Sequence, residues 1–181
     1  MTSANTDHQI ATTIRRRPSL TVLIVLVAAV VMYMTQFAQN DFYVGTYMDD
    51  ANYVILAESI AEGRGYRQIN YPDAPLETRY PPGYPVVLAP IIALVGNNLN
   101  LLKLPSVIAT SLAVWLVWRL FGDRISDRRK VLFALMLFSL NPLIVGHSVA
   151  VMSEGVFLLV VLLAVWAIDR SGQLEGLHSA K

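Results

Sequence analysis

The chain has 181 residues, of which 55% are hydrophobic and 15% charged, and its mean hydropathy is +0.49. A soluble domain usually carries about 25% charged residues, so this deficit indicates a membrane protein. The net charge of +1 gives no basic field for binding nucleic acid, and the lack of cysteine excludes disulfides and thiolate metal sites.

The chain begins with a polar segment, 1–17, that we expect to be a cytoplasmic tail, because it ends in three consecutive arginines, Arg15 to Arg17. The apolar run 20–38 that follows is long enough for a transmembrane helix, which needs about 20 residues. A cleaved secretory signal begins in a similar way, but its apolar core has only about 7–15 residues, and no small-x-small cleavage site follows Tyr33. We therefore expect an uncleaved signal-anchor helix.

The segment 39–100 is predicted to be a large extracytoplasmic loop with short amphipathic or interfacial helices. Within it, 49–63 has the pattern of a short amphipathic helix that starts with two acids and stops at Gly63. The apolar piece 84–96 would be roughly 20 Å long as a helix, against a hydrocarbon core of about 30 Å. We therefore expect it to be interfacial or re-entrant.

Three more apolar segments, at about 101–121, 131–147 and 154–170, are predicted to span the membrane before a polar tail, 171–181. Asn141-Pro142 predicts a kink in the second of them. Basic residues cluster between the first two and should be cytoplasmic: Arg119, Arg124, Arg128, Arg129 and Lys130. Because Arg15 to Arg17 should also be cytoplasmic, the chain must cross the membrane an even number of times between the two basic clusters. The segments 20–38 and 101–121 provide two crossings. The predicted fold is an all-α membrane protein with about four transmembrane helices.

This topology brings three acids to the outer face: Asp49 and Asp50 in the first loop, and Glu154 at the start of the last span. One aspartate could act as a general base or bind a divalent cation. The alternatives are that Asp49 or Asp50 is an N-cap, and that Ser153 caps the last span while Glu154 complements its dipole.

Arg64, Arg67, Arg79 and Tyr80 are candidate contacts for a phosphate group of the substrate, because guanidinium groups donate paired hydrogen bonds to phosphate. The alternative is solvated loop charge for Arg64 and Arg67. Arg79 and Tyr80 precede a stiff proline-rich stretch, Pro81 to Pro85, which could hold their side chains or merely connect two helices. His147 is taken as an interfacial residue rather than a ligand, and the motifs of common soluble enzymes are missing.

An ordered set of these motifs resembles the start of a GT-C fold glycosyltransferase. The resemblance covers roughly 15–170 and is greatest to the bacterial branch that is related to protein O-mannosyltransferases and lipid A aminoarabinose transferases. The residues that carry it are Asp49-Asp50, Tyr53, Ala57, Ile60, Gly63, Gly65-Tyr66, Arg79 to Pro85, Lys103 to Ser106, Asn141-Pro142 and Met152-Ser153-Glu154.

The resemblance implies a polytopic enzyme of the inner (cytoplasmic) membrane that transfers a sugar from a polyprenyl-phosphate carrier to an acceptor on the periplasmic or exterior face. It implies that Asp49 is the catalytic acid of the first loop, that Asp50 is its acidic neighbour, and that Glu154 is a second acid able to help hold a metal. Aminoarabinose transferases have Glu-Lys where this chain has Arg79-Tyr80, which leaves the donor open.

The family also has more spans than the four predicted here, so we expect either an N-terminal fragment, which need not be active by itself, or a minimal relative. The alternative function is a non-catalytic membrane subunit or transporter that binds or flips a lipid-linked sugar. A transporter would place polar groups near the membrane midplane, and the sequence shows no charge there.

Overall fold

The computed structural model describes residues 19–39, 45–122 and 124–171. Over these residues the protein is all-helical, and its only strand-like pairing is an isolated antiparallel bridge between Arg67 and Leu76. The predicted all-α class is therefore confirmed. The predicted tails, 1–17 and all but residue 171 of 171–181, lie outside the described residues.

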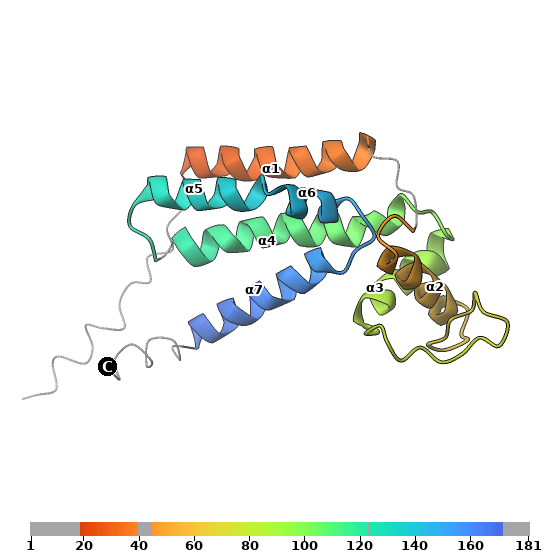
Figure 1. Cartoon of the computed structure of the whole chain (residues 1–181). Coiled ribbons are helices and arrows are strands. Elements are labelled where there is room, and N and C mark those ends of the chain that lie inside the picture. The colour runs from red at the N-terminus through yellow and green to blue at the C-terminus, as the bar shows by residue number, and fades with distance from the viewer. Residues whose placement is uncertain (1–18, 40–44, 123, 172–181) are drawn as a thin grey trace, which may run out of the picture.

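The helices fall into two groups, which Figure 1 shows one beyond the end of the other. A bundle runs along the long axis, and a smaller cap, made of residues 45–100, lies at one of its ends. The cap contains α2 (Asp49–Ala61) and α3 (Gly83–Val95), which pack against each other. After a 3-10 helix, Leu101–Lys103, the chain enters the bundle, which is made of α1 (Leu20–Gln39), α4 (Leu104–Gly122), α5 (Arg128–Ser139), α6 (Pro142–Ser148) and α7 (Glu154–Arg170).

Helix α4 forms the centre of the bundle and contacts α1, α5, α6 and α7. In an apolar stretch of 18 residues within Leu101–Gly122, 61% of the residues are buried, against 17% in the corresponding stretch of α1. The outer faces of α1 and α7 expose large apolar side chains, among them Ile24, Val27, Phe157 and Val160. Apolar surface of this extent matches a lipid environment rather than water.

Within the part of the chain that the structure describes, two helices are long and apolar enough to cross a membrane, Leu20–Ala38 and Leu101–Gly122, and α5 with α6 gives a third if the bent pair is one span. That pair is bent by 53°. Asn141 caps α6 by accepting the N–H of Leu143 at 2.9 Å, and Pro142 follows it at the helix start, so the predicted kink is confirmed. Helix α7 is not long enough to count as a fourth span, because its 17 residues extend over about 26 Å, against a hydrocarbon core of about 30 Å. That α7 crosses the membrane stays a prediction.

Helices α4 and α7 approach closely at Gly155. A Cβ atom built on Gly155 would lie 2.7 Å from Oγ1 of Thr110 and 3.0 Å from the carbonyl oxygen of Ser106. Small residues allow such helix contacts within membranes. The same region is tied by Ser106, whose hydroxyl donates to the carbonyl of Met152 at 2.9 Å.

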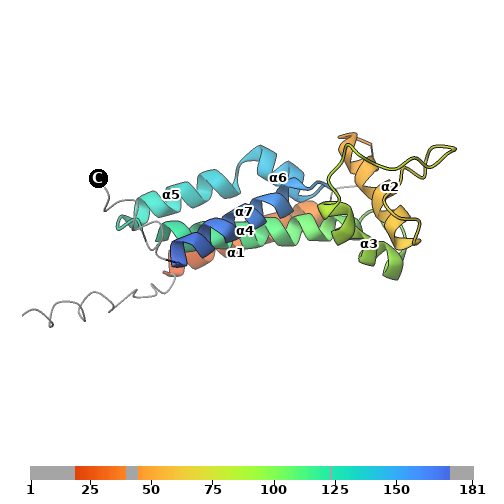
Figure 2. The same cartoon turned by 90° about the horizontal axis from the view of Figure 1, so that it is seen from below.

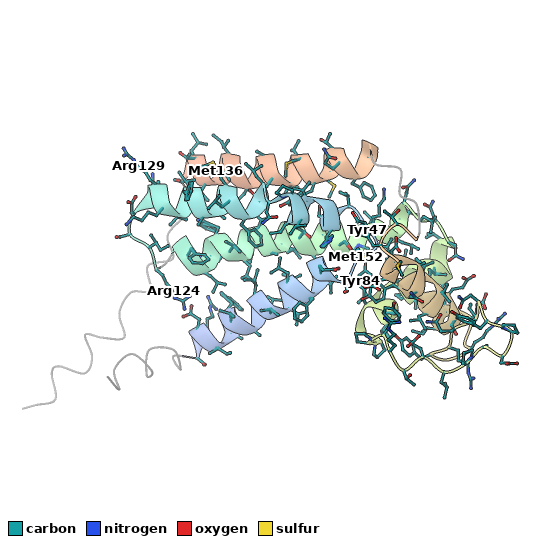
Figure 3. All side chains as sticks on the ribbon, in the orientation of Figure 1. Tyr47, Tyr84, Arg124, Arg129, Met136 and Met152 are labelled. Atoms are coloured by element: carbon teal, nitrogen blue, oxygen red, sulfur yellow. The ribbon has the colours of Figure 1, made fainter. Side chains whose placement is uncertain are left out.

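The basic cluster that is predicted to be cytoplasmic lies at the far end of the bundle from the cap. In Figure 3, Arg124 and Arg129 mark one end, while Tyr47, Tyr84 and Met152 mark the other. Seen from below in Figure 2, the cap again lies beyond one end of the bundle. The start of α7, with Glu154, points towards the cap, so the acids predicted to share one face do lie at one end of the molecule.

Candidate active site

The two aspartates at the start of α2 have different surroundings. Asp50 is fully buried, and its carboxylate accepts backbone N–H groups from Ala51 at 2.7 Å, Gly45 at 3.0 Å and Tyr47 at 3.5 Å. The N-cap position itself is Met48, which has φ 62° and makes no side-chain capping bond. The alternative that Asp49 or Asp50 is the N-cap is therefore wrong, since these are the first two residues of α2 itself. Asp50 instead binds the backbone of the loop in front of the helix and of the first turn.

Asp49 is half-buried and faces the loop that precedes α3. Its Oδ1 accepts the hydroxyl hydrogen of Tyr80 at 2.9 Å, and the oxygen of Tyr80 in turn accepts a hydrogen from Nδ2 of Asn52 at 3.1 Å. The hydrogen bond to Asp49 is the main cause that raises the pKa of Tyr80 above its ordinary value. Tyr80 therefore keeps its proton and remains a donor to Asp49 throughout the neutral range.

The loop that carries Tyr80 folds back on itself as a short hairpin. Gln68 N–H donates to the carbonyl of Pro75 at 2.9 Å, and Glu77 N–H donates to the carbonyl of Tyr66 at 3.0 Å. The Tyr66 hydroxyl donates to the carbonyl of Tyr80 at 2.9 Å, and burial raises the pKa of Tyr66 to about 12. The hairpin thus fixes the backbone on both sides of Tyr80.

Glu77 organises the end of this hairpin. Its carboxylate accepts hydrogens from Nε2 of Gln68, from the N–H of Arg79 and, at 3.1 Å, from the N–H of Tyr80. The bond from Gln68 is the largest cause that lowers the pKa of Glu77, and it outweighs partial desolvation. Glu77 is therefore ionised at neutral pH and holds Tyr80 through its backbone.

A row of tyrosines joins the cap to the bundle. The rings of Tyr80 and Tyr53 have centroids 5.8 Å apart, those of Tyr53 and Tyr84 are 5.2 Å apart, and both pairs meet edge to face. The hydroxyl of Tyr53 is 3.1 Å from Oγ of Ser153, and that of Tyr84 is 2.8 Å from Oγ of Ser106. These contacts bring the start of α7 to the base of the cap.

Glu154 is the first residue of α7 and is exposed. The predicted capping of α7 by Ser153 is wrong in one respect, because the side chain of Ser153 makes no capping bond and pairs with Tyr53 instead. Glu154 and His147 both line a cavity of about 80 Å³ between α4, α6 and α7, with Thr110 on its wall. His147 also meets the ring of Tyr47 edge to face at 5.8 Å.

The three arginines of the loop have separate surroundings. Arg64 is exposed and pairs with Glu62 at 2.9 Å, while Nη1 of Arg67 donates to the carbonyl of Ala74 at 3.1 Å. The guanidinium carbon of Arg79 lies 5.8 Å from the ring centre of Tyr80. Only Arg79 is thus shown in contact with the partner of Asp49.

The described side chains around Asp49 and Glu154 do not form a dedicated metal site. Within 19–39, 45–122 and 124–171, no three His, Cys, Asp or Glu residues gather closely enough to hold a metal. A dedicated site for a divalent cation usually takes more ligands than Asp49 and Glu154 alone could give. Their role as metal ligands stays a prediction, and no chemical step below depends on it.

Asn52 and Gln68 were not predicted as site residues, and no function was predicted for Glu77. Gln68 Nε2 donates to Oδ1 of Asn52 at 3.2 Å as well as to Glu77, and so links the hairpin to α2. A carboxamide in a loop leaves no periodic pattern, so the sequence holds no signal for this pairing. The one available hint was the position of Asn52 one helical turn after Asp49.

Comparison with known proteins adds a family. Residues 79–174, about half of the chain, match the model of the family described as dolichyl-phosphate-mannose-protein mannosyltransferase. No curated protein and no solved structure matches the chain significantly. The match includes Arg79, Tyr80, Glu154 and helices α3 to α7, and it begins after Asp49. Apolar helices of membrane-spanning length and this match agree, and the chain belongs to the dolichyl-phosphate-mannose-protein mannosyltransferase family, a group of membrane glycosyltransferases.

Proposed function

We propose that the chain takes part in transferring a sugar from a polyprenyl-phosphate carrier to an acceptor hydroxyl, with Asp49 as the general base. The family supports the glycosyl transfer, and the lipid-like surface of the bundle supports a membrane-borne donor. The resemblance of the cap motifs to the bacterial branch with the aminoarabinose transferases supports an extracytoplasmic reaction at the inner membrane.

The observation that carries this proposal is the division of labour between the two aspartates. Asp50 is buried and bound to three backbone N–H groups, so it stabilises the start of α2. Asp49 is half-buried, with one carboxylate oxygen held by Tyr80. Its Oδ2 has no hydrogen-bond partner among the described residues and can accept a proton from an incoming hydroxyl.

The reaction forms one bond and breaks another at the anomeric carbon of the sugar. The acceptor oxygen attacks this carbon while its proton passes to Asp49, and the bond from the carbon to the phosphate oxygen breaks. The polyprenyl phosphate leaves with the electron pair, and Arg79 next to Tyr80 supplies positive charge for it. Arg64 and Arg67 are second choices for this phosphate contact, because Glu62 and the carbonyl of Ala74 already engage them.

The distribution of basic residues supports an exterior position for the cap. Arg124, Arg128, Arg129 and Lys130 lie at the opposite end of the bundle from the cap, and basic residues favour the cytoplasmic side. The cap, with Asp49 at its base, would then face the exterior. Glu154, exposed at the same end, is proposed to line the donor site or to share a metal ion with Asp49.

The test is the substitution Asp49→Asn in the full chain, produced in membranes and assayed with a radiolabelled polyprenyl-phosphate sugar. Loss of a general base lowers a rate by about 100-fold or more, so transfer should fall by at least this factor while membrane insertion is unchanged. Asp73→Asn is the matched control, because Asp73 is an exposed loop acid. Transfer at the wild-type rate by the Asp49→Asn variant would overturn the proposal.

A further inference from the structure

A line of hydrogen bonds leads from the hairpin of the cap to Asp49. It passes from Glu77 through Gln68, Asn52 and Tyr80. We propose that this relay is directional and that Glu77 is a remote positioning residue for Asp49. This inference rests on the proposed function, in which Asp49 is the general base.

The direction is set at Glu77. An ionised carboxylate only accepts hydrogen bonds, so the amide group of Gln68 must present its Nε2 hydrogens to it. The second hydrogen of Nε2 then points to Oδ1 of Asn52, 3.2 Å away. A flipped Gln68 would place its oxygen against the acceptor atoms of both Glu77 and Asn52, with no hydrogen between them.

Asn52 transmits this orientation across α2. Because its Oδ1 accepts from Gln68, its Nδ2 faces the other way and donates to Oη of Tyr80 at 3.1 Å and to the carbonyl of Met48 at 2.9 Å. Both hydrogens of the amide are thereby used. A flipped Asn52 would lose these two bonds and oppose the donor of Gln68.

Tyr80 completes the relay. Its oxygen is occupied by the hydrogen from Asn52, and its own hydrogen is directed to Oδ1 of Asp49 at 2.9 Å. Hydrogen bonds in such a line polarise one another, so each strengthens the next. The relay thereby holds Asp49 in one rotamer and turns its other carboxylate oxygen away from Tyr80.

Burial makes the relay costly to rearrange. Gln68 is only 8% exposed, and its Oε1 is buried without a hydrogen-bond partner among the described residues. Leaving a buried carbonyl oxygen unpaired is unfavourable, so the hydrogen bonds that Nε2 donates must compensate for it to keep Gln68 in this orientation. The bond from Nε2 to ionised Glu77 is the strongest available gain.

The first measurement is a double-mutant cycle on transfer by the full chain, with Glu77→Gln and Tyr80→Phe. We expect each single substitution to lower kcat by about 10-fold with KM for the donor nearly unchanged, because ordering of the base is lost and not donor binding. In the Tyr80→Phe background, Glu77→Gln should have less than about a 2-fold further effect, since the relay is already cut. Independent, multiplicative losses would overturn the relay.

The second measurement needs no activity. Fluorotyrosine placed at position 80 reports the environment of this side chain by fluorine NMR. The midpoint of the fluorotyrosine titration should be lower in Glu77→Gln than in the wild type, and should approach the midpoint in Asp49→Asn, in which position 49 has lost its carboxylate. Glu58→Gln is the matched control, because Glu58 also accepts a side-chain amide, Nδ2 of Asn97 at 2.9 Å, but lies outside the relay. An unchanged titration in Glu77→Gln would contradict the relay.

The two failures are distinguishable. If Asp49→Asn keeps full transfer while the fluorine signal still responds to Glu77→Gln, then the relay exists and the proposed base is wrong. If Asp49→Asn abolishes transfer while the fluorine signal ignores Glu77→Gln, the base stands and the relay is overturned.

Discussion

The bundle and the cap are stabilised by different kinds of contact. In the bundle, apolar side chains such as Val107, Val114 and Leu135 are fully or almost fully buried around α4, and the outer faces remain apolar. In the cap, α2 and α3 share a small apolar cluster, but the loop between them is held by side-chain hydrogen bonds. The surface of the bundle is thus suited to contact with lipid, whereas the cap holds polar side chains in fixed positions.

This difference shows where function can be placed in a membrane protein. Polar side chains are costly inside the hydrocarbon core unless they are paired, whereas a cap at its edge can carry several of them. The tyrosine row and Ser153 tie the cap to the bundle, so the position of Asp49 depends on both regions. Substitutions in one region should therefore affect the other only where such a tie is broken.

The largest effect within the cap is expected for Asp50→Asn. The substitution replaces a buried carboxylate that accepts three backbone N–H groups by an amide with a single acceptor oxygen. We expect a loss of about 2–4 kcal/mol in the stability of the cap, because charged hydrogen bonds are lost and donors are left unpaired. Limited proteolysis of the 45–100 region in detergent would measure it.

Asp49→Asn is the comparison for that substitution. Asp49 is half-buried, and among the described residues its one side-chain partner is the hydroxyl of Tyr80, so the expected loss of stability is below about 1 kcal/mol. Equal proteolytic sensitivity of the two variants would contradict the division of labour between the aspartates.

The next effect concerns the bundle, at Gly155. In Gly155→Ala the new methyl group would lie within 3.0 Å of both Thr110 and Ser106, so α7 must move away from α4. Overpacking of this kind costs about 1–3 kcal/mol. Thermal unfolding in nanodiscs should show a lower midpoint for Gly155→Ala than for Gly146→Ala, whose added Cβ meets nothing within 4 Å. Equal midpoints would refute the close approach of the two helices.

The smallest expected effect is a loss of hairpin stability at acidic pH. Because the folded hairpin lowers the pKa of Glu77, ionised Glu77 contributes stability above its ordinary pKa of 4.5, and this contribution is lost as the pH falls through the lower folded value. Exchange of the Tyr80 amide hydrogen, measured by mass spectrometry, should accelerate beyond the intrinsic pH effect as the pH falls below 4.5. Glu77→Gln should abolish this acid step, and an acid step that survives in that variant would assign it to another group.

The helices of the bundle were predictable because lipid imposes a simple rule on long segments. The runs 20–38 and 101–121 match helical segments closely, and Asn141-Pro142 gave the break between α5 and α6. The bounds predicted for the last span, 154–170, coincide with those of α7, but whether its 17 residues cross the membrane stays a prediction. The shortness of 84–96 was also predictable, and α3 has 13 residues, but its depth in the membrane is still a prediction.

The site was predictable only in part. The sequence indicated that Asp49, Asp50 and Glu154 would share one end of the molecule, because an even number of crossings follows from the positions of the basic residues. Apart from the family resemblance, the residue pattern could not separate Asp49 from Asp50, since adjacent aspartates look alike until the loop backbone around Gly45 is folded. Nor could it pair Gln68 with Asn52, because that contact depends on the path of the hairpin and not on a repeat.

The central claim is that the cap, with Asp49, works at the exterior end of the bundle. The chain contains no cysteine, so single cysteines can be introduced into an unmodified background. Asp73→Cys lies in the exposed cap loop and Arg128→Cys at the exposed start of α5. In spheroplasts, a membrane-impermeant maleimide should label Asp73→Cys at once and Arg128→Cys only after the membrane is opened. The reverse order of labelling would place the cap in the cytoplasm and contradict the account.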